Sequence, residues 1–286
     1  MEAYVSMYAA CPDGGGVVQK DCVYNQLLLK NKKMKNRFFK ISCLLLLVMG
    51  IMACNNSAKK SSGANDTALT ETLNKTEMSK GEWVSLFDGK TQNGWHGFNK
   101  PAGAMKNWTI EDSALTCLGA AADAHGGDIV SDKEYENFEL AWEWKVTKGA
   151  NSGVMYHVVE DQKYQAPYET GPEYQVIDDI GFPGKLEEWQ KAGADYGMNV
   201  ANDKKKLKPV GQWNISKIIF NKGNVEHWLN GEKILEFMAW DDAWKKKRQE
   251  SKWKDYPDYG SAKKGRIALQ DHGNKVYYKN IMIREL

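Results

Sequence analysis

The stretch FELAWEWKV, residues 138–146, alternates apolar and mainly polar side chains with a period of two residues. In an extended strand this period places Phe138, Leu140 and Trp142 on one face and the intervening residues on the other. A helix would instead need apolar residues three and four positions apart. The stretch therefore predicts a β-strand with one face in a hydrophobic core.

Similar short runs follow along the chain and are separated by turns rich in glycine and asparagine. The dipeptide Asn230-Gly231 is typical of a type I′ hairpin turn, because both residues tolerate positive φ. Helical patterns are few and short, at residues 186–191 and 242–250. Many short strands joined by tight turns predict an all-β sandwich or jelly roll of two antiparallel sheets, rather than a parallel α/β sheet. The remaining predicted strands are residues 153–159, 173–178, 214–220, 224–229, 232–237, 265–270 and 276–284.

The composition is that of a globular protein with a sizeable core, since the 286 residues are 42% hydrophobic and 27% charged. Residues 1–53 hold seven of the 39 Lys and Arg and three of the 37 Asp and Glu, which leaves the remainder with a net charge of −2. Such a near-neutral chain lacks the basic surface of a nucleic-acid-binding protein. All 11 Trp follow residue 80. They can serve either as core residues and cross-strand pairs or as stacking platforms for sugar rings.

The N-terminal part has the pattern of a secretory signal. A basic segment, residues 35–40, precedes an apolar run, residues 41–52, which at about 12 residues is too short to span a bilayer comfortably. The ending Ile-Met-Ala-Cys at Cys54 resembles a bacterial lipobox. This resemblance implies cleavage before Cys54 and lipidation of its sulfur, and the alternative is an ordinary signal with a chance cysteine.

Four segments are therefore predicted. Residues 1–33 precede the expected start, 34–53 form a lipoprotein signal peptide, 54–80 form a flexible polar tether, and 81–286 form the folded domain. The anchor predicts a location at the periplasmic side of the outer membrane. Only Cys117 then remains in the folded domain, so we expect a buried free thiol and neither a disulfide within the chain nor a structural zinc site.

Polar residues on three predicted strands share the face opposite the apolar set. They are His157, Glu173, Gln175, Arg266 and Gln270, and the dipeptide Asp271-His272 follows the last of these strands. On a concave sheet these side chains would converge into a ligand site. Each of them alone is more often part of a solvated strand face, so only their joint occurrence indicates a site.

Six segments, in this order along the chain, are similar to the 3-keto-disaccharide hydrolase domain family, which occurs in Bacteroidetes. The resemblance spans about residues 81–286 and implies a concanavalin-like β-sandwich that acts on glycosides oxidised to a ketone at C3. Together with the lipobox it implies a Bacteroidetes lipoprotein. Where the family pattern after Asn-Ser-Gly often ends in Arg, this chain has His157. The segments are WVSLFDGK (83–90) with Gly94-Trp95, NSGV (151–154), EYQVID (173–178), GQWN (211–214), VEHWLNG (225–231), and IALQDHG (267–273) followed by KNI (279–281).

A ketone at C3 acidifies the hydrogen on C2, so removal of this proton allows elimination of the C1 aglycone, and water can add afterwards. The reaction needs a base of near-neutral pKa and a stabiliser for the enolate oxygen. Histidine suits the base, which makes His157 and His272 the candidates, while Glu173 would be an acid–base partner or metal ligand. Asp178 has the opposite parity from Glu173, so its inclusion requires a bulge or a strand end. The candidate substrate-binding residues are Gln175, Gln270, Asp178, Asp128 and Trp95, and His125 lies in a glycine-rich loop that could rim the site.

The implied substrate is an oxidised glycoside, which a sugar 3-dehydrogenase would supply. A divalent metal suits enolate chemistry, but no ligand spacing in the sequence demonstrates one. Two other functions remain open: a non-catalytic carbohydrate-binding module of the same fold, and a classical glycosidase with two carboxylates. Against the glycosidase, Glu173 has no second carboxylate of matching parity two residues away, only Gln175.

Overall fold

The computed structural model describes residues 81–103, 105–119 and 127–286, all of which belong to one unit of the chain, Asp66–Leu286. The predicted upstream segment, signal peptide, lipidation site at Cys54 and tether lie outside the described residues, as does His125. Within the described ranges, no helix combines the length and the apolar character that a membrane crossing requires.

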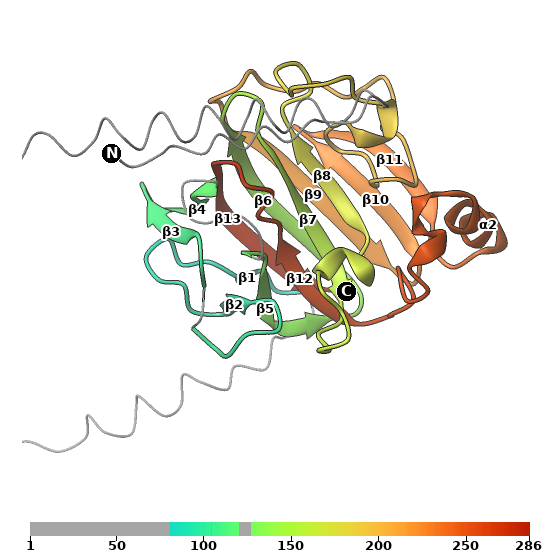
Figure 1. Cartoon of the computed structure of the whole chain (residues 1–286), viewed down its shortest axis with the longest axis horizontal. Coiled ribbons are helices and arrows are strands. Elements are labelled where there is room, and N and C mark those ends of the chain that lie inside the picture. The colour runs from blue at the N-terminus through green and yellow to red at the C-terminus, as the bar shows by residue number, and fades with distance from the viewer. Residues whose placement is uncertain (1–80, 104, 120–126) are drawn as a thin grey trace, which may run out of the picture. The chain divides into compact units, whose positions relative to one another are not determined.

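Two antiparallel sheets overlie one another in the structure (Figure 1), which confirms the predicted all-β sandwich of the jelly-roll type. The larger sheet has the strand order β11-β10-β9-β6-β13-β4-β3, with β1 also paired to β13. The smaller sheet has the order β2-β5-β12-β7-β8. The larger sheet comprises β1 (Val84–Ser85), β3 (Trp108–Glu111), β4 (Ala114–Cys117), β6 (Phe138–Val146), β9 (Asn214–Asn221), β10 (Asn224–Leu229), β11 (Glu232–Met238) and β13 (Val276–Glu285). The smaller sheet comprises β2 (Trp95–Gly97), β5 (Ile129–Tyr135), β7 (Asn151–Val158), β8 (Glu173–Ile177) and β12 (Gly265–Leu269).

Helices are few among the described residues. The α-helix α2 (Asp242–Glu250) follows β11 and lies at the side of the sandwich next to β10 and β11 (Figure 1). Its first turn is capped by Asp241, whose side chain accepts a hydrogen bond from the Trp244 N–H. Short 3₁₀ helices occur at Pro167–Glu169, Glu188–Gln190 and Lys252–Asp255.

The core lies between the two sheets and follows the predicted alternation. In β6, Phe138, Leu140, Trp142 and Trp144 are all buried at 2% exposure or less. The facing strands of the smaller sheet contribute alternate residues in the same way, among them Tyr174, Val176, Ile267 and Leu269. Because one set of side chains on each strand of the smaller sheet fills this core, the other set points to the outer face, where the polar residues were expected. Cys117 is buried and free, as predicted.

The hairpin turn between β10 and β11 also follows the sequence. Asn230 and Gly231 have φ angles of 49° and 91°, and Leu229 pairs with Glu232 across the turn. These angles are those of a type I′ turn. The Asn230 side chain accepts a hydrogen bond from the Ile215 N–H at 2.9 Å, which ties the turn to β9.

The predicted position of His157 is wrong. This residue has a φ of 53°, and β7 is irregular there, with Met155 paired to Ala268 and Val158 to Arg266. Between these two pairs β7 advances by three residues and β12 by two, so β7 contains a β-bulge. The bulge turns His157 into the core, where its ring centroid lies 4.4 Å from that of Phe220.

Candidate functional site

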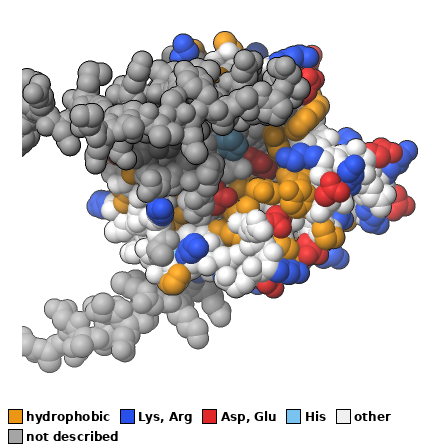
Figure 2. All heavy atoms as spheres, viewed as in Figure 1, with side chains coloured by type: hydrophobic (Ala, Val, Ile, Leu, Met, Phe, Trp, Pro, Cys, Tyr) orange, Lys and Arg blue, Asp and Glu red, His pale blue; other side chains and the backbone are white. Residues whose placement is uncertain are grey.

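A pocket of about 260 Å³ opens on the outer face of the smaller sheet. We call it the Glu173 pocket. It gathers four of the predicted site residues: Glu173 and Gln175 from β8, and Gln270 and His272 from the segment after β12. On the face shown in Figure 2, hydrophobic side chains gather beside acidic and basic ones next to α2. The pocket is lined by Asn151, Tyr168, Glu173, Gln175, Tyr196, Lys252, Trp253, Tyr256, Gln270 and His272.

Glu173 is the buried ionisable group of this pocket, with 4% of its surface exposed. Burial raises its pKa to about 8; the charge of Lys252 opposes this rise, and those of Asp128 and Asp195 add to it. No hydrogen bond or ion pair reaches its carboxyl group from any described residue. At neutral pH Glu173 therefore carries a proton that it can donate to a bound ligand.

The space for the Glu173 carboxyl comes from a glycine on the neighbouring strand. A β-carbon at Gly153 would lie 2.0 Å from Glu173 Oε1, so no larger residue fits without moving Glu173. Met155 pairs with Glu173 and Gly153 pairs with Gln175, so the carboxyl leans across the diagonal of the β7–β8 ladder.

Two amide oxygens of residues in the lining have no hydrogen-bond partner among the described residues. They are Asn151 Oδ1 and Gln270 Oε1, and both are buried. Buried acceptors without partners are costly, which indicates that a ligand or water completes them. Gln175 differs, because its Nε2 donates to Gln190 O and its Oε1 accepts from Val176 N, both at 3.1 Å.

An aromatic and basic wall completes the pocket, and the sequence analysis did not identify it. Lys252 Nζ lies 4.5 Å from the ring centroids of both Tyr196 and Trp253. Trp253 is held in place by a hydrogen bond from its Nε1 to Tyr196 O at 2.9 Å and by stacking on Tyr259. The available signal was the cluster Lys-Trp-Lys-Asp-Tyr at residues 252–256, which combines aromatic rings with charge just after a helix.

His272 is exposed at the rim, in a loop anchored by its neighbour Asp271. The Asp271 side chain accepts hydrogen bonds from Asn107 Nδ2 and from Gly273 N, and its own N–H donates to Asp128 Oδ1 at 2.7 Å. Two neighbouring segments, at Asn107 and Asp128, and a bond within the loop thus fix the start of the loop that carries His272.

Asp128 lines an adjacent hollow of about 270 Å³, not the Glu173 pocket itself. Burial raises its pKa to about 7; the Asp271 N–H lowers the pKa and the Asp271 charge raises it. The Asp128 charge also raises the pKa of Glu173 and of Tyr168, so Asp128 stands close to the pocket wall.

Comparisons with known proteins identify the family. Residues 82–284 match the family described as the 3-keto-alpha-glucoside-1,2-lyase-like domain. The chain belongs to this family. A 3-keto-disaccharide hydrolase of Bacteroides thetaiotaomicron is 33% identical over 293 residues, which cover 88% of this chain and 100% of that protein.

Two solved structures from Parabacteroides distasonis, both described as candidate glycosyl hydrolases, share the fold of this lyase-like domain. The first is 44% identical with a TM-score of 0.67, and the match covers 71% of this chain and 94% of that one. The second is 27% identical with a TM-score of 0.53, and the match covers 72% and 100%.

Two predicted site residues of the lyase-like domain, Trp95 and His157, lie in the core. Trp95 faces the core with 2% exposure, where its Nε1 donates to Leu86 O at 2.6 Å, so it is not a substrate platform. His157 is in the core, as described above; burial lowers its pKa to about 4, and its Nε2 lies 2.9 Å from Glu136 O. Neither side chain reaches the Glu173 pocket, because each points between the sheets.

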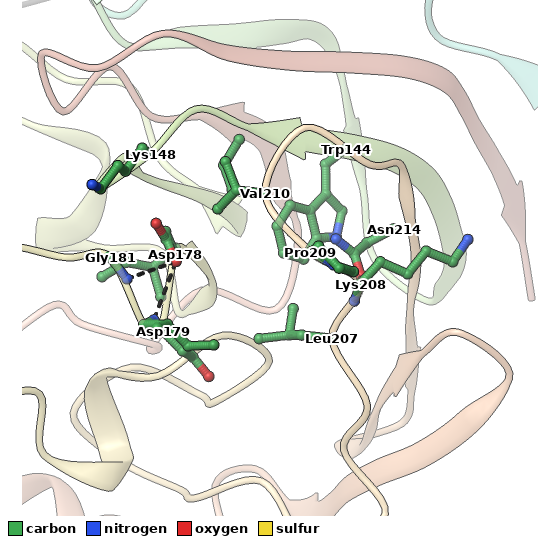
Figure 3. A pocket seen from close by; sticks show the side chains of 13 residues that line it. Trp144, Lys148, Asp178, Asp179, Gly181, Leu207, Lys208, Pro209, Val210 and Asn214 are labelled. Carbon is green, nitrogen blue, oxygen red and sulfur yellow. Dashed lines mark hydrogen bonds between the residues drawn. The ribbon is translucent and has the colours of Figure 1, made fainter.

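Asp178 lines a different pocket, which is shown in Figure 3. Its carboxylate accepts hydrogen bonds from the backbone N–H groups of Gly149, Ile180 and Gly181. Burial alone would raise the pKa of Asp178, but these three donors outweigh it and the pKa is lowered. Asp178 therefore closes the loop after β8 and does not bind substrate in the Glu173 pocket. The pocket in Figure 3, of about 420 Å³, is mainly apolar and contains no other predicted site residue.

The donor set of the Glu173 pocket is sparse for a resident metal. Within the described ranges, no group of three or more His, Cys, Asp or Glu side chains is arranged to hold an ion. The lining supplies one carboxyl group and one exposed imidazole, whereas a catalytic zinc site has three protein ligands.

Proposed function

We propose that this chain is an enzyme that cleaves the glycosidic bond of 3-keto-glycosides, with the Glu173 pocket as its active site. The family and the relative named as a 3-keto-disaccharide hydrolase support this substrate class. The observation that carries the proposal is a buried, protonated carboxyl group without a hydrogen-bond partner among the described residues, beside a histidine and two unpaired amide oxygens.

The chemistry of a 3-keto sugar matches these groups. A base removes the C2 proton, and the negative charge that develops on the C3 oxygen needs a hydrogen-bond donor in a dry site. A carboxylic acid kept neutral at pH 7 by burial is such a donor. We therefore assign Glu173 to the C3 ketone, where its hydrogen bond strengthens as the enolate forms, and Lys252 adds positive charge nearby.

The C2 proton requires a separate base. His272 stands at the rim of the Glu173 pocket, whereas His157 is enclosed in the core. We propose His272 as the base. Collapse of the enolate then expels the C1 group, and addition of water to the resulting enone gives net hydrolysis.

Asn151, Gln270 and the aromatic wall would orient the sugar. The two unpaired oxygens, Asn151 Oδ1 and Gln270 Oε1, are acceptors for sugar hydroxyl groups. Tyr196 and Tyr256 present partly exposed rings along one side of the pocket, and aromatic faces pack well against apolar surfaces of a ligand. Positioning by these groups would hold C2 near the base.

One observation favours a second candidate, a conventional glycosidase. Glu173 and Asp128 are two carboxyl groups close enough for the Asp128 charge to raise the pKa of Glu173, and retaining or inverting glycosidases use such pairs. That chemistry breaks the C1–O bond without touching C2–H and needs no ketone. The two functions therefore make opposite predictions about the substrate.

The deciding experiment supplies the purified protein in D₂O with a 3-keto-glucoside and with its unoxidised parent, and follows both by NMR. We expect cleavage of the 3-keto compound only, with deuterium entering C2 of the product. Glu173→Gln should lose most of this activity, while the control Glu134→Gln, on an exposed position of β5, should keep it. Cleavage of the parent with C2–H retained would establish the glycosidase instead, and binding without turnover would establish a carbohydrate-binding module.

We also propose that the enzyme is anchored through a lipidated Cys54 at the periplasmic side of the outer membrane. The support is the basic and apolar order of residues 35–54. Because the substrate must first be oxidised at C3, a sugar 3-dehydrogenase would act before this enzyme.

A further inference from the structure

The Asp128 hollow has no role in the mechanism above. It lies beside the Glu173 pocket, and its lining mixes aromatic rings, amides and charged groups as a sugar site does. The lining residues are Phe98, Asn99, Lys100, Asp128, Gln162, Tyr164, Gln165 and Pro167. With about 270 Å³ against about 260 Å³, the two spaces are of similar size.

The hollow and the pocket lie over one buried apolar cluster. An apolar cluster on the outer face of the smaller sheet joins Phe98, Val130, Met155, Val158 and Ala268. Two tyrosines of the β7–β8 loop pack on this cluster. One of them, Tyr164, lines the hollow, and the other, Tyr168, lines the Glu173 pocket. The two tyrosines therefore place the hollow and the pocket side by side over the same part of the sheet.

Asp128 stands where the two spaces meet. Its Oδ1 accepts from the Asp271 N–H at 2.7 Å, and Asp271 lies between Gln270 and His272, both of which line the Glu173 pocket. Its second carboxyl oxygen has no hydrogen bond from any described residue. One oxygen is thus fixed by the backbone while the other remains available to a ligand.

We propose that the Asp128 hollow binds the group attached to C1 of the substrate, and that Asp128 protonates the glycosidic oxygen as it leaves. This inference rests on the proposed function, since it assigns the second ring of a 3-keto-disaccharide. Burial holds the pKa of Asp128 at about 7, so a large share of the molecules carries the required proton at neutral pH. General acids act best when their pKa lies near the working pH.

In the proposed elimination, each proton and electron pair has a defined destination. The base takes the C2 proton, the electron pair of C2–H forms the C1=C2 bond, and the C1–O bond breaks with its pair on oxygen. That oxygen takes the proton of Asp128, which gives an enone and an alcohol. Asp128 remains as a carboxylate and recovers its proton from solvent. Without the acid, a sugar alkoxide would have to leave, which is unfavourable.

Substrates that differ in the leaving group test the acid. A 3-keto-glucoside with a second sugar at C1 needs protonation, whereas one with 4-nitrophenol does not, because 4-nitrophenolate is a stable anion. We expect Asp128→Asn to lower kcat/KM for the disaccharide by about 10²–10⁴-fold and to change it little for the aryl glycoside. The amide oxygen of Asn can still accept from Asp271 N, which preserves the fold.

The control is Asp179→Asn. Asp179 is a partly buried aspartate outside both spaces, where it pairs with Lys205 at 2.7 Å. This variant should keep the wild-type ratio of the two kcat/KM values. Equal losses on both substrates, or no loss on the disaccharide, after Asp128→Asn would overturn the acid assignment. If the wild type cleaves neither substrate, the proposed function itself fails, which is a different outcome.

A second variant tests the subsite independently of the acid. Gln165→Ala removes a polar side chain from the lining of the Asp128 hollow. We expect KM to rise for the 3-keto-disaccharide and to stay unchanged for the 3-keto methyl glucoside, whose C1 group is too small to fill the hollow. A KM that moves equally for both substrates, or for neither, would overturn the placement of the leaving group.

Discussion

Replacing Glu173 with Gln should stabilise the folded protein while removing the proposed catalytic carboxyl group. Burial raises the pKa of this residue from 4.5 to about 8. In the unfolded chain the side chain ionises near 4.5, so between these two values ionisation favours the unfolded state. The stability contributed by Glu173 is therefore complete below about pH 4.5 and is lost progressively as the pH rises toward 8.

The size of the effect follows from the same two values. Each pH unit between them costs the folded state about 1.4 kcal/mol. At pH 7 the accumulated cost is about 3 kcal/mol. Gln has nearly the same shape and carries no charge, so Glu173→Gln should be more stable than the wild type by about this amount at pH 7. Below about pH 4.5 the two proteins should have nearly equal stability.

Urea denaturation of wild type and variant at pH values from about 5 to 8 measures this difference. The control is Glu134→Gln, because Glu134 is exposed on β5, and surface substitutions change stability by about 0.5 kcal/mol or less. We expect the Glu173→Gln difference to grow with pH and the control difference to stay flat. A Glu173→Gln difference that does not depend on pH, or a variant less stable than the wild type throughout, would refute the assignment of a buried, neutral carboxyl group.

Four further substitutions test the remaining assignments. His272→Ala should lower kcat on a 3-keto-glucoside by about 10²–10⁴-fold without changing the melting temperature. His157→Ala should instead lower the free energy of unfolding in urea by about 2–4 kcal/mol, because it opens a cavity in the core and leaves Glu136 O unpaired. Near-full activity of His272→Ala would remove it as the base. Gly231→Val should lower stability by about 1 kcal/mol or more in the same assay, because Val tolerates the observed φ of 91° poorly, and an unchanged midpoint would argue against that strain. Cys54→Ala should move the protein from the membrane fraction to the soluble fraction; identical fractionation and processing would refute the lipid anchor.

The sequence predicted the strands that have one face in the core. Residues 138–146 and 224–229 were predicted as strands and 242–250 as a helix, and the structure has these elements with the same bounds. The strands β1–β4 were not predicted. β1 and β2 have two and three residues, too few to show a period of two, and all four residues of β4 are buried, so β4 does not alternate. The strand β5 begins Ile-Val-Ser-Asp, and its first three residues are all buried, so it does not alternate either.

The face on which a site residue lies was predicted correctly where its strand alternates regularly, and wrongly where the strand has a bulge. Glu173, Gln175 and Gln270 lie on the expected face because their strands are regular up to those positions. His157 does not, because a bulge with positive φ at a residue other than glycine has no reliable signature in a single sequence. Lys252 and Tyr196 come from segments far from the pocket strands along the chain, so only the tertiary structure brings them to Glu173.

The Asn-Ser-Gly segment at the start of β7 shows how one short motif builds this site. Asn151 lines the pocket, and its buried Oδ1 has no hydrogen-bond partner among the described residues. Ser152 points the other way, and its hydroxyl lies 2.6 Å from Gln270 O and 2.7 Å from the Tyr278 hydroxyl, which ties β7 to the end of β12 beside the pocket. Gly153 returns to the outer face and, by having no side chain, leaves the space that the Glu173 carboxyl occupies. Three consecutive residues thus supply a side chain of the pocket lining, a structural link between β7 and the end of β12, and the space for the Glu173 carboxyl.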